Sequence, residues 1–599
     1  MHGFHGRYWR FDLSRGEGRM IPLPERILRR YLGGVGLGTW LLHREAPPGV
    51  DPLAPEAPLV FSFSPLVGTP LTTSAKLAVV AKSPLTGFIS DGLSSSHFAI
   101  AGKRMGVDAI VLVGACAEPS ELVNGALRPT ASWRSTPGET ERALSKHGRV
   151  AAIGVAGENR VRFATISNDG RHAGRGGLGA VMGAKRLKAL VVRGDLPTPI
   201  ADPKAVTRLS RDLSRRSLGA ATAKYRDLGT VANLAAFNRI AALPTRNFQR
   251  SQFGEGDALA AEALKPQREV ARAACASCTI GCEHVYGFGD SDRTRIEYES
   301  LFALGPLCGI GDPEAVLAAA GRCDALGLDT VSAGGTIAFA MECAERGYLP
   351  DAPRFGDAAG LLALLDDIAH RRGLGDLLAE GSRIAAQRIG HDSIAFAPQV
   401  KGLEIPGYEP RALQTLALGF AVGSRGADHN KSGAYELDFS DRVDRLRGDA
   451  RSAVLSLETE NRAALTDSLI LCKFLRGVFE DLYGESAELV RAVTGWDMSG
   501  EELEALARRI VAARKAFNVR EGWTPDDDSL PERFLSEPLD DGASAGARLT
   551  RERLREMVRS YNLARGWSAQ GYLPEAVMRD LWLDPSPTDA APDGRVVEP

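Results

Sequence analysis

Three of the eight cysteines lie within eight residues, as Cys275, Cys278 and Cys282. Thiols at this spacing can converge on one small group, and four interpretations of them are possible. A disulfide cannot pair three thiols, and the residues after Met1 lack the apolar stretch of a secretory signal. Structural zinc, with His284 as a neighbouring ligand, usually takes two separated pairs of ligands. An iron–sulfur cluster takes four cysteines, so the spacing favours a cluster over these sites and over buried cysteines without metal.

A fourth thiol has to come from elsewhere in the chain, and the candidates are Cys116, Cys308, Cys323, Cys343 and Cys472. Cys116 ends an apolar run typical of a strand and Cys343 lies in an apolar run typical of a helix, so both fit a core. Cys472 ends the segment Asp467–Cys472, which repeats the Asp-x-x-x-Leu pattern of Asp324–Asp329. A polar hexamer that occurs twice indicates two equivalent tasks, such as binding two copies of one group.

A glycine-rich loop with two arginines is a candidate anion site. Gly174, Gly176 and Gly179 formally match G-x-G-x-x-G, but several residues separate them from the preceding strand, unlike in the dinucleotide fingerprint. Arg171 and Arg175 flank the first glycine. Glycines let backbone N–H groups approach an anion closely, and guanidinium groups complete its binding. We interpret this segment as a phosphate or pyrophosphate site rather than as a structural loop.

Two other polar segments are candidates for proton chemistry. Arg425–Lys431 places four charged or titratable side chains around a glycine turn, and among them His429 can exchange a proton near neutral pH. The alternative for this segment is a solvated loop. Glu299 follows the cysteines and precedes an apolar run, where a carboxylate usually caps a helix and is otherwise a functional group.

The composition is that of an ordinary globular protein, with 599 residues, of which 44% are hydrophobic and 25% charged. The net charge of −2 argues against nucleic acid as the main partner. Since no run of eighteen apolar residues occurs, we expect no membrane-spanning segment. We therefore expect a cytoplasmic, reduced protein, in which clustered cysteines bind metal.

The elements that position these residues change character along the chain. Residues 1–200 contain short β-branched runs bounded by Gly, Pro or Asp, which predict strands, and a glycine-rich loop at Gly33–Gly38. The patterns of the later residues predict helices, and two helix starts are predicted, at Asp312-Pro313 and at the capping box Ser499–Glu502. The fold class is therefore α+β, with an N-terminal β-rich cofactor-binding domain followed by two mainly α-helical domains. The expected bounds are 1–200, 201–400 with three cysteines, 401–585 with Cys472, and a Pro/Asp-rich disordered tail at 586–599.

These motifs together resemble the tungsten-dependent aldehyde ferredoxin oxidoreductase family over nearly the whole chain. The matching segments are Gly33–Gly38, Ser83–Gly87, Gly157–Asn159, Ala173–Gly183 with Lys185, Cys275–Cys282, Glu297–Glu299, both Asp-x-x-x-Leu segments, Arg425–His429 and Phe517–Gly522. The cysteine motif, combined with a late cysteine in the second Asp-x-x-x-Leu segment, is the most specific of these matches.

The resemblance implies a [4Fe-4S] cluster held by Cys275, Cys278, Cys282 and Cys472. It also implies a tungsten or molybdenum bis-pyranopterin without protein sulfur on the metal, and Mg²⁺ as an optional ion between the pterin phosphates. The implied cofactor-binding residues are Lys76, Leu93, Ser95, Arg171, His172, Gly174, Arg175, Asp324, Leu328, Asp329, Arg425, Lys431, Asp467, Leu471 and Lys473. Glu299 and His429 correspond to the active-site carboxylate and imidazole of the family.

The implied reaction is the oxidation of aldehydes to carboxylic acids, with ferredoxin or a ferredoxin-like subunit as electron acceptor, in a homo- or hetero-oligomer. Two alternatives stay open: a relative that reduces an activated ring or acid, and a paralogue that has lost the pterin but kept the cluster. The chain departs from the family at Lys76, where an arginine is usual, and at Asp91–Ser95, which replaces Ser-Asn-Ser-Gly-Gly. Ile470 replaces the glycine of the second pterin-binding segment, and a Glu-x-x-His pair expected near Ala318–Gly321 is absent.

Overall fold

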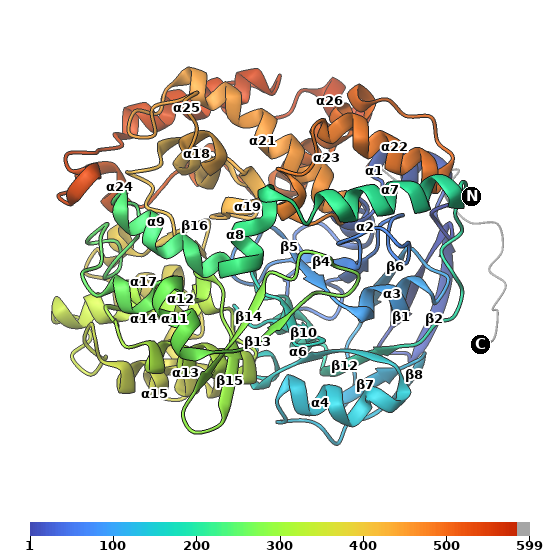
Figure 1. Ribbon diagram of the computed structural model, residues 1–599. Helices are drawn as coiled ribbons and strands as arrows, with labels where there is room; N and C mark the ends of the chain where they lie inside the picture. Colours follow the sequence, from blue (N-terminus) through green and yellow to red (C-terminus); the bar gives the residue numbers. More distant parts are fainter. Residues whose placement is uncertain (584–599) are drawn as a thin grey trace.

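The computed structural model describes residues 1–583, so the tail predicted at 586–599 lies outside the described residues. Two six-stranded sheets lie on one side of the molecule, at the right of Figure 1, and helices fill the other side and the top. The predicted α+β class, with a β-rich N-terminal part and a mainly helical remainder, is confirmed. The predicted domain bounds at 200 and 400 stay predictions.

The first sheet has the order β2-β1-β6-β3-β4-β5, in which only β1 and β6 run parallel. Its strands are β1 (Arg7–Asp12), β2 (Glu17–Pro22), β3 (Leu59–Ser62), β4 (Lys76–Lys82), β5 (Ile89–Ser95) and β6 (Ala109–Val113). Residues 59–62 and 109–113 are fully buried, as expected of apolar runs in the middle of a sheet. The edge strand β5 and the start of β4 face the helical half and carry candidate site residues.

The second sheet has the order β11-β10-β9-β12-β7-β8, with only β12 and β7 parallel. Its strands are β7 (Ser120–Val123), β8 (Ala126–Pro129), β9 (Arg149–Ile153), β10 (Ile166–Asn168), β11 (Arg171–Ala173) and β12 (Leu187–Val192). Two small antiparallel sheets are formed by β13 (Glu269–Ala273), β14 (Glu283–Phe288) and β15 (Asp292–Arg295), and by β16 (Gln399–Val400) and β17 (Leu403–Glu404). The edge strand β11 directly precedes Gly174, whereas the sequence predicted several residues between the preceding strand and the first glycine.

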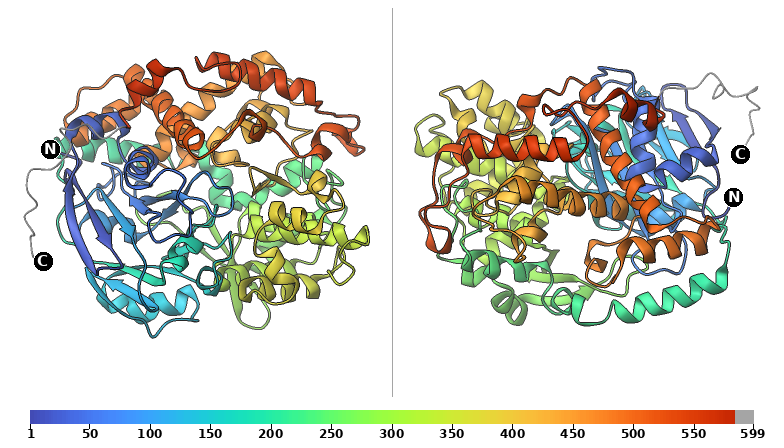
Figure 2. Two further views of the ribbon diagram at one scale, coloured as in Figure 1. Left: turned by 180° about the vertical axis from the view of Figure 1, so that it is seen from behind. Right: turned by 90° about the horizontal axis from the view of Figure 1, so that it is seen from above.

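Helices cover the sheets and build the remainder of the molecule (Figures 1 and 2). Those of the first 260 residues are α1 (Glu25–Tyr31), α2 (Gly34–Glu45), α3 (His97–Lys103), α4 (Pro137–Leu144), α5 (Val155–Glu158), α6 (Leu178–Ala184), α7 (Pro203–Arg216), α8 (Ala220–Leu228), α9 (Asn233–Arg239) and α10 (Gly256–Leu259). The next are α11 (Ala261–Arg268), α12 (Tyr298–Leu304), α13 (Pro313–Leu326), α14 (Thr330–Glu345), α15 (Ala358–His370), α16 (Leu374–Leu378), α17 (Ser382–Ile389) and α18 (Gln414–Val422). The last are α19 (His429–Ser432), α20 (Tyr435–Asp438), α21 (Ala450–Leu469), α22 (Leu482–Thr494), α23 (Gly500–Arg520), α24 (Glu532–Ser536), α25 (Arg551–Ala564) and α26 (Glu575–Leu581).

Both predicted helix starts are confirmed. The Asp312 side chain accepts a hydrogen bond from the Glu314 N–H at the start of α13, with proline in the first turn. Ser499 and Glu502 form the predicted capping box of α23. These helix starts can be predicted because the partners lie only two or three residues apart in the sequence.

The glycine-rich segment Gly33–Gly38, expected as a loop, is instead the first part of helix α2. Its glycines allow close packing. A Cβ atom at Gly34 would lie 2.4 Å from the Asp467 carbonyl oxygen, and one at Gly38 would lie 2.6 Å from the Val80 side chain. The segment therefore brings α2 against α21 and β4, at the interface between the sheets and the helical half.

Candidate functional site

The four cysteines expected to bind a cluster come together in the structure. Cys275, Cys278 and Cys282 lie in the loop between β13 and β14, and Cys472 follows α21. Thr73 links the two segments, because its N–H donates to the Ser277 carbonyl at 2.6 Å and its Oγ1 accepts from the Cys472 N–H at 3.2 Å. Thr73, which adopts a positive φ in the loop before β4, was not predicted as a site residue, because no local pattern marks it.

The Cys282 thiol is buried among several groups that can carry negative charge. Burial raises the pKa of Cys282, and negative charge on Glu297, Cys472, Cys275 and Cys278 raises it further. By contrast, the remaining four cysteines are almost fully buried in the apolar cores. These are Cys116, Cys308, Cys323 and Cys343. Among the candidates for a fourth thiol, the structure therefore brings Cys472 to the cysteine loop.

The arrangement does not suit a single zinc ion. Among residues 1–583, no three side chains of Cys, His, Asp or Glu are grouped so that one ion could bind them all. His284, the zinc ligand considered from the sequence, has Nδ1 3.0 Å from the Glu269 carboxylate. In an iron–sulfur cluster each thiolate binds its own iron, so a cluster, unlike one ion, does not require the sulfurs to reach a single atom.

Both Asp-x-x-x-Leu segments are C-termini of helices with the same backbone geometry. The fourth residue of each is left-handed: Gly327 after α13, with φ 76°, and Ile470 after α21, with φ 64°. The N–H of the next residue then reaches back five positions, from Leu328 to Cys323 and from Leu471 to Thr466, at 2.9 and 3.0 Å. This is the hydrogen bond of a Schellman motif.

The two leucines of these segments are buried, and the two aspartates at their starts pair with basic side chains. Asp324 lies 3.4 Å from His172 Nε2, and Asp467 lies 2.7 Å from Lys431 Nζ. Because the Leu328 and Leu471 side chains point into the core, only their backbone groups are available to a cofactor. The aspartates and their partners are the polar part of each segment.

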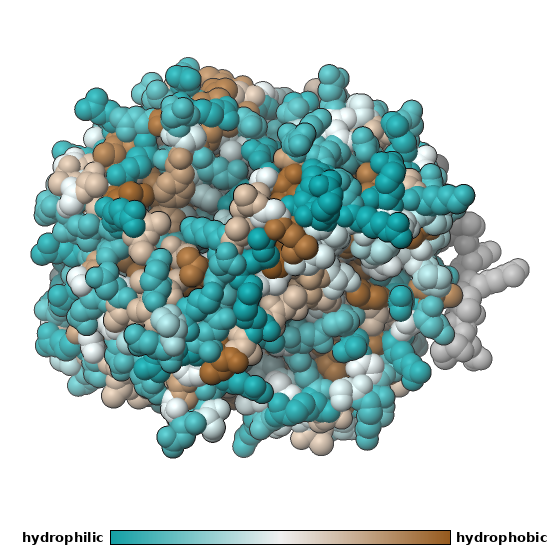
Figure 3. All heavy atoms as spheres, viewed as in Figure 1, coloured by the Kyte–Doolittle hydropathy of each residue, from teal (hydrophilic) through white to brown (hydrophobic). Residues whose placement is uncertain are grey.

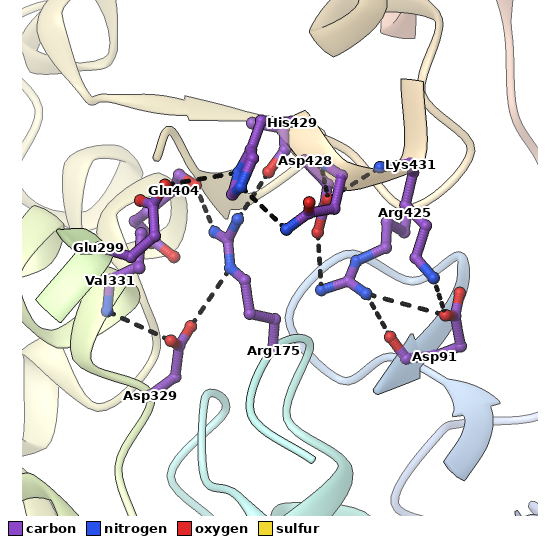
Figure 4. Close-up of polar contacts among 12 residues, drawn as sticks. Asp91, Arg175, Glu299, Asp329, Val331, Glu404, Arg425, Asp428, His429 and Lys431 are labelled. Atoms are coloured by element: carbon purple, nitrogen blue, oxygen red, sulfur yellow. Dashed lines mark hydrogen bonds and ion pairs between the residues drawn. The ribbon is translucent and has the colours of Figure 1, made fainter. Parts of the chain in front are cut away.

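Asp91 is a site residue that the sequence analysis did not single out. It is fully buried in β5 and forms ion pairs with Arg514 at 2.6 Å, Lys431 and Arg425. Burial alone would raise the pKa of Asp91, but these three cations hold it well below its usual range. Figure 4 shows Arg425 and Lys431 converging on this carboxylate. The available signal was a carboxylate inside a strand whose other residues are only Ile, Leu, Gly and Ser.

Glu299 and His429 face each other, as expected of an active-site pair (Figure 4). Glu299 lies in the first turn of α12, where its Oε2 accepts from the Gly407 N–H at 2.9 Å, and its Oε1 lies 3.5 Å from His429 Nδ1. Asn430 Nδ2 lies 2.8 Å from His429 Nε2, and an amide nitrogen can only donate. We therefore assign the imidazole proton to Nδ1, on the side of Glu299.

The environment shifts the pKa values of Glu299 and His429 in opposite directions. Burial raises the pKa of the Glu299 carboxyl to about 7, against the opposing effects of the Gly407 hydrogen bond and the Arg175 charge. Burial lowers the pKa of His429 to about 3. At neutral pH the carboxyl is therefore poised between its two forms, and the imidazole is neutral and can donate a hydrogen bond through Nδ1.

The two arginines of the glycine-rich loop reach different places. Arg171 donates to Cys275 Sγ at 3.1 Å and pairs with Glu283 and, at 3.3 Å, with Glu297. Arg175 donates to the carbonyl oxygens of residues 427 and 404, and its Nε lies 3.5 Å from Asp329 (Figure 4). Between them, a Cβ at Gly174 would meet nothing within 4 Å, so this backbone faces open space.

The remaining predicted cofactor residues lie in the same region. Strand pairing places Lys76 opposite Ser95, with Leu93 two residues further back on β5. Burial alone would lower the pKa of Lys76, but negative charge on nearby residues, Cys472 first among them, raises it. Lys473 donates to the Asn430 carbonyl and lies 3.7 Å from Asp467. The structure thus gathers these residues between the thiols and Glu299; their contacts with a cofactor stay predictions.

Five buried polar atoms in this region form no hydrogen bond within residues 1–583, although four of them face each other in two pairs at 3.5 Å. The atoms concerned are Arg175 Nε, Glu299 Oε1, Asp329 Oδ2, His429 Nδ1 and Asp467 Oδ1, all buried and without a hydrogen bond. Buried polar atoms in native proteins are nearly always paired. Burial also raises the pKa of the Asp324 carboxyl in the same region.

Four converging thiols beside a buried polar cluster with a carboxylate–imidazole pair are groups expected of a redox enzyme. Family models agree with this class. Residues 8–194 match the N-terminal domain of aldehyde ferredoxin oxidoreductase, and residues 206–583 match domains 2 and 3. The chain belongs to the aldehyde ferredoxin oxidoreductase family.

Similar proteins span the full chain. The tungsten-containing aldehyde ferredoxin oxidoreductases of Pyrococcus furiosus and Thermococcus kodakarensis are each 36% identical, over 97% of this chain and 99% of theirs. The WOR-like subunit of an aliphatic sulfonate oxidoreductase from Pyrococcus furiosus is 27% identical over 97% of each chain. A chain of the active site complex BamBC of benzoyl coenzyme A reductase has the same fold, with a TM-score of 0.82 at 24% identity over 97% of each chain.

No helix among residues 1–583 is both long and apolar enough to cross a bilayer, in line with the sequence-based expectation.

Proposed function

We propose that this protein oxidises aldehydes to carboxylic acids and passes the electrons to ferredoxin or a ferredoxin-like subunit. The observation that carries the proposal is the Glu299–His429 pair, held 3.5 Å apart in a buried polar cluster, in a chain of this family. Its relatives with full-length similarity are named as tungsten-containing aldehyde ferredoxin oxidoreductases.

The residues present fit the two implied cofactors. Cys275, Cys278, Cys282 and Cys472 would hold a [4Fe-4S] cluster, and Arg171 would balance its negative charge through the contact with Cys275. The side chains that would bind a tungsten or molybdenum bis-pyranopterin are Lys76, Ser95, His172, Arg175, Asp324, Asp329, Arg425, Lys431, Asp467 and Lys473. Gly174, Leu328 and Leu471 would contribute backbone groups, and Leu93 an apolar contact. Mg²⁺ between the pterin phosphates completes the proposal.

The protein residues supply binding and proton transfer. When bound, the metal–pterin group accepts the two electrons of the oxidation, and the iron–sulfur cluster releases them singly. Ionised Glu299 takes a proton from the attacking water, which its pKa of about 7 permits at neutral pH. Neutral His429 donates its Nδ1–H to the carbonyl oxygen of the aldehyde as negative charge develops there. Arg175, bound to two backbone carbonyls, keeps the loop at Gly174 in place.

Metal and pterin analysis of anaerobically purified protein tests this proposal, together with aldehyde-dependent reduction of a viologen dye. We expect about four irons, two pterins and one tungsten or molybdenum per chain, and turnover with at least one aliphatic or aromatic aldehyde. A full complement of iron without pterin, from cells supplied with both metals, would instead identify a cofactor-free electron-transfer paralogue. Cofactor-loaded protein that reduces an activated ring or acid but oxidises no aldehyde would identify the other alternative.

A further inference from the structure

A row of cations runs along the outer side of α7 and ends at the cysteine loop. Lys204, Arg208, Arg211 and Arg215 follow each other at intervals of four, three and four residues, which places them on one face of the helix. The Arg215 side chain is 76% exposed. In Figure 3, hydrophilic surface follows the position that α7 has in Figure 1. The buried residues of α7 lie on its opposite face.

Few acidic groups neutralise this row. Within residues 1–583, no ion pair involves the first three cations, and Arg215 pairs with Asp212 at 2.6 Å. The segments next to the cysteine loop, 203–228 and 261–273, together contain ten Lys and Arg but only four Asp and Glu. Their net charge is therefore +6, whereas that of the whole chain is −2. The excess of positive charge is local and not a property of the whole surface.

The cations surround an uncharged centre that lies over the thiols. Residues 274–282 contain no charged side chain, and Ala274, Ser277 and Thr279 are exposed. Leu218, directly after α7, is 53% exposed. An uncharged centre with a charged rim is the usual composition of a protein–protein interface.

Two contacts join α7 and α8 to the cysteine segments. At the end of α7, the Ser217 hydroxyl lies 2.6 Å from that of Thr279, which is between the second and third cysteines. In α8, the Tyr225 ring stacks on Phe474, two residues after Cys472, with ring centroids 4.0 Å apart. The face is therefore fixed directly over both parts of the proposed cluster site, and a protein docked here comes close to the thiols.

We propose that this surface, the α7–α8 face (Lys204, Arg208, Arg211, Arg215 and Leu218), docks a small acidic iron–sulfur protein that carries one electron. The proposal rests on the cluster of the proposed function. The oxidation R-CHO + H2O → R-COOH + 2 H⁺ + 2 e⁻ releases two electrons, so two such carriers leave with one electron each. Complementary charge accelerates the encounter of the two proteins, and the uncharged centre around Leu218 lets their redox groups approach closely.

The test compares two charge reversals of equal size in the cofactor-loaded protein. R211E/R215E reverses two cations four residues apart on α7. The matched control R555E/R559E reverses two exposed arginines at the same spacing on α25, at the top left of Figure 1 and away from α7. The probe is a [4Fe-4S] ferredoxin of net negative charge. Its Kd is measured at low and high salt, and its reduction by the dithionite-reduced protein is followed by stopped flow.

We expect R211E/R215E to raise the Kd and lower the rate of ferredoxin reduction by about tenfold or more at low salt, with a smaller effect at high salt. In the control R555E/R559E, the Kd and the rate of ferredoxin reduction should change by less than about twofold. The rate at which R211E/R215E reduces a viologen dye should also change by less than about twofold, because the dye does not need the α7–α8 face. Leu218→Ser should weaken binding at both salt concentrations. An unchanged Kd in R211E/R215E, or an equal loss in the control, would overturn the proposal.

Failure of the proposed function gives a different result. The dithionite-reduced protein needs no aldehyde to donate an electron, so binding and stopped-flow reduction can succeed where aldehyde turnover fails. That outcome would support the α7–α8 face and refute aldehyde oxidation. Normal aldehyde turnover with dye, combined with ferredoxin binding that R211E/R215E leaves intact, would refute the docking face alone.

Discussion

The pKa of Glu299 predicts how turnover depends on pH. A carboxyl with a pKa of about 7 is about one-tenth ionised at pH 6 and about nine-tenths ionised at pH 8. If the ionised form is the base, kcat/KM for an aldehyde should rise about tenfold over this interval and then level off. His429, with a pKa of about 3, stays neutral throughout and adds no second limb to the profile.

Glu299→Gln tests the assignment, because the amide keeps the shape of the side chain and an oxygen that can accept from the Gly407 N–H. Loss of a positioned base lowers rates by about 10²–10⁴-fold. The remaining activity should no longer change between pH 6 and pH 8. The assay is aldehyde-dependent viologen reduction, with iron and tungsten or molybdenum contents measured on the same samples.

The same pKa has a consequence for stability, which is independent of turnover. The pKa of Glu299 is higher in the folded protein, at about 7, than the ordinary value of 4.5, so the folded state binds more protons between these values. The free energy of unfolding must then fall as the pH rises from about 4.5 to 7, by about 3 kcal/mol in all. Glu299→Gln removes this cost, so its Tm should exceed that of the wild type at pH 8 and differ much less at pH 5.

Glu141→Gln is the matched control. Burial raises the pKa of Glu141 to about 7 as well, but this carboxyl lies on α4, where it accepts from the Ser167 hydroxyl at 2.9 Å. Its replacement should leave the pH profile of turnover unchanged. Near-normal turnover of Glu299→Gln, or a pH profile that persists in it, would refute the assignment of the base. Loss of tungsten or molybdenum from that variant would show that Glu299 is structural instead.

Three further changes probe the rest of the site. Cys472→Ser should lower the iron content and abolish the EPR signal of the reduced cluster, and full iron with an unchanged spectrum would exclude it as a ligand. Asp91→Asn should lower the Tm, because it removes the anion that pairs with buried Arg514 and one of the two anions beside each of Arg425 and Lys431, at a cost of about 3–5 kcal/mol. An unchanged Tm would mean that other groups balance the charge of these cations. Ile470→Gly should relieve about 1–2 kcal/mol of left-handed backbone strain but lose about 2–5 kcal/mol of stabilisation from the buried side chain. Chemical denaturation should therefore show a lower free energy of unfolding, and a higher one would contradict this balance.

The features that could be predicted from the sequence depend on near neighbours in the chain. The cysteine spacing, the capping carboxylate of Asp312 and the capping box at Ser499 each involve residues a few positions apart. The family resemblance placed Glu299 and His429 in one pair, and the structure brings them to 3.5 Å. Without the resemblance, nothing local connects two side chains that are more than a hundred residues apart.

The features that could not be predicted depend on distant partners. Arg171 and Arg175 are four residues apart and were expected at one anion, yet one reaches Cys275 and the other Asp329. The ion pairs of Asp91 with Arg514 join a strand to a helix from the far end of the chain. Glycines in α2 were interpreted as a loop because they usually mark turns, whereas here they permit close packing of a helix.

In the repeated hexamer, one backbone geometry positions two different functional residues. Each copy ends a helix in a left-handed residue, which turns the chain so that the sixth position leaves the helix in a fixed direction. In the first copy that position is Asp329, whose carboxylate accepts from the Val331 N–H and faces Arg175 in the buried polar cluster. In the second it is Cys472, whose N–H donates to Thr73 beside the cysteine loop. Since the backbone geometry is shared, the residue at the sixth position decides whether the helix end contributes to the polar cluster or to the group of thiols. The isoleucine at the fourth position of the second copy adopts the left-handed conformation that glycine has in the first, which indicates that this geometry is required strongly enough to offset its strain.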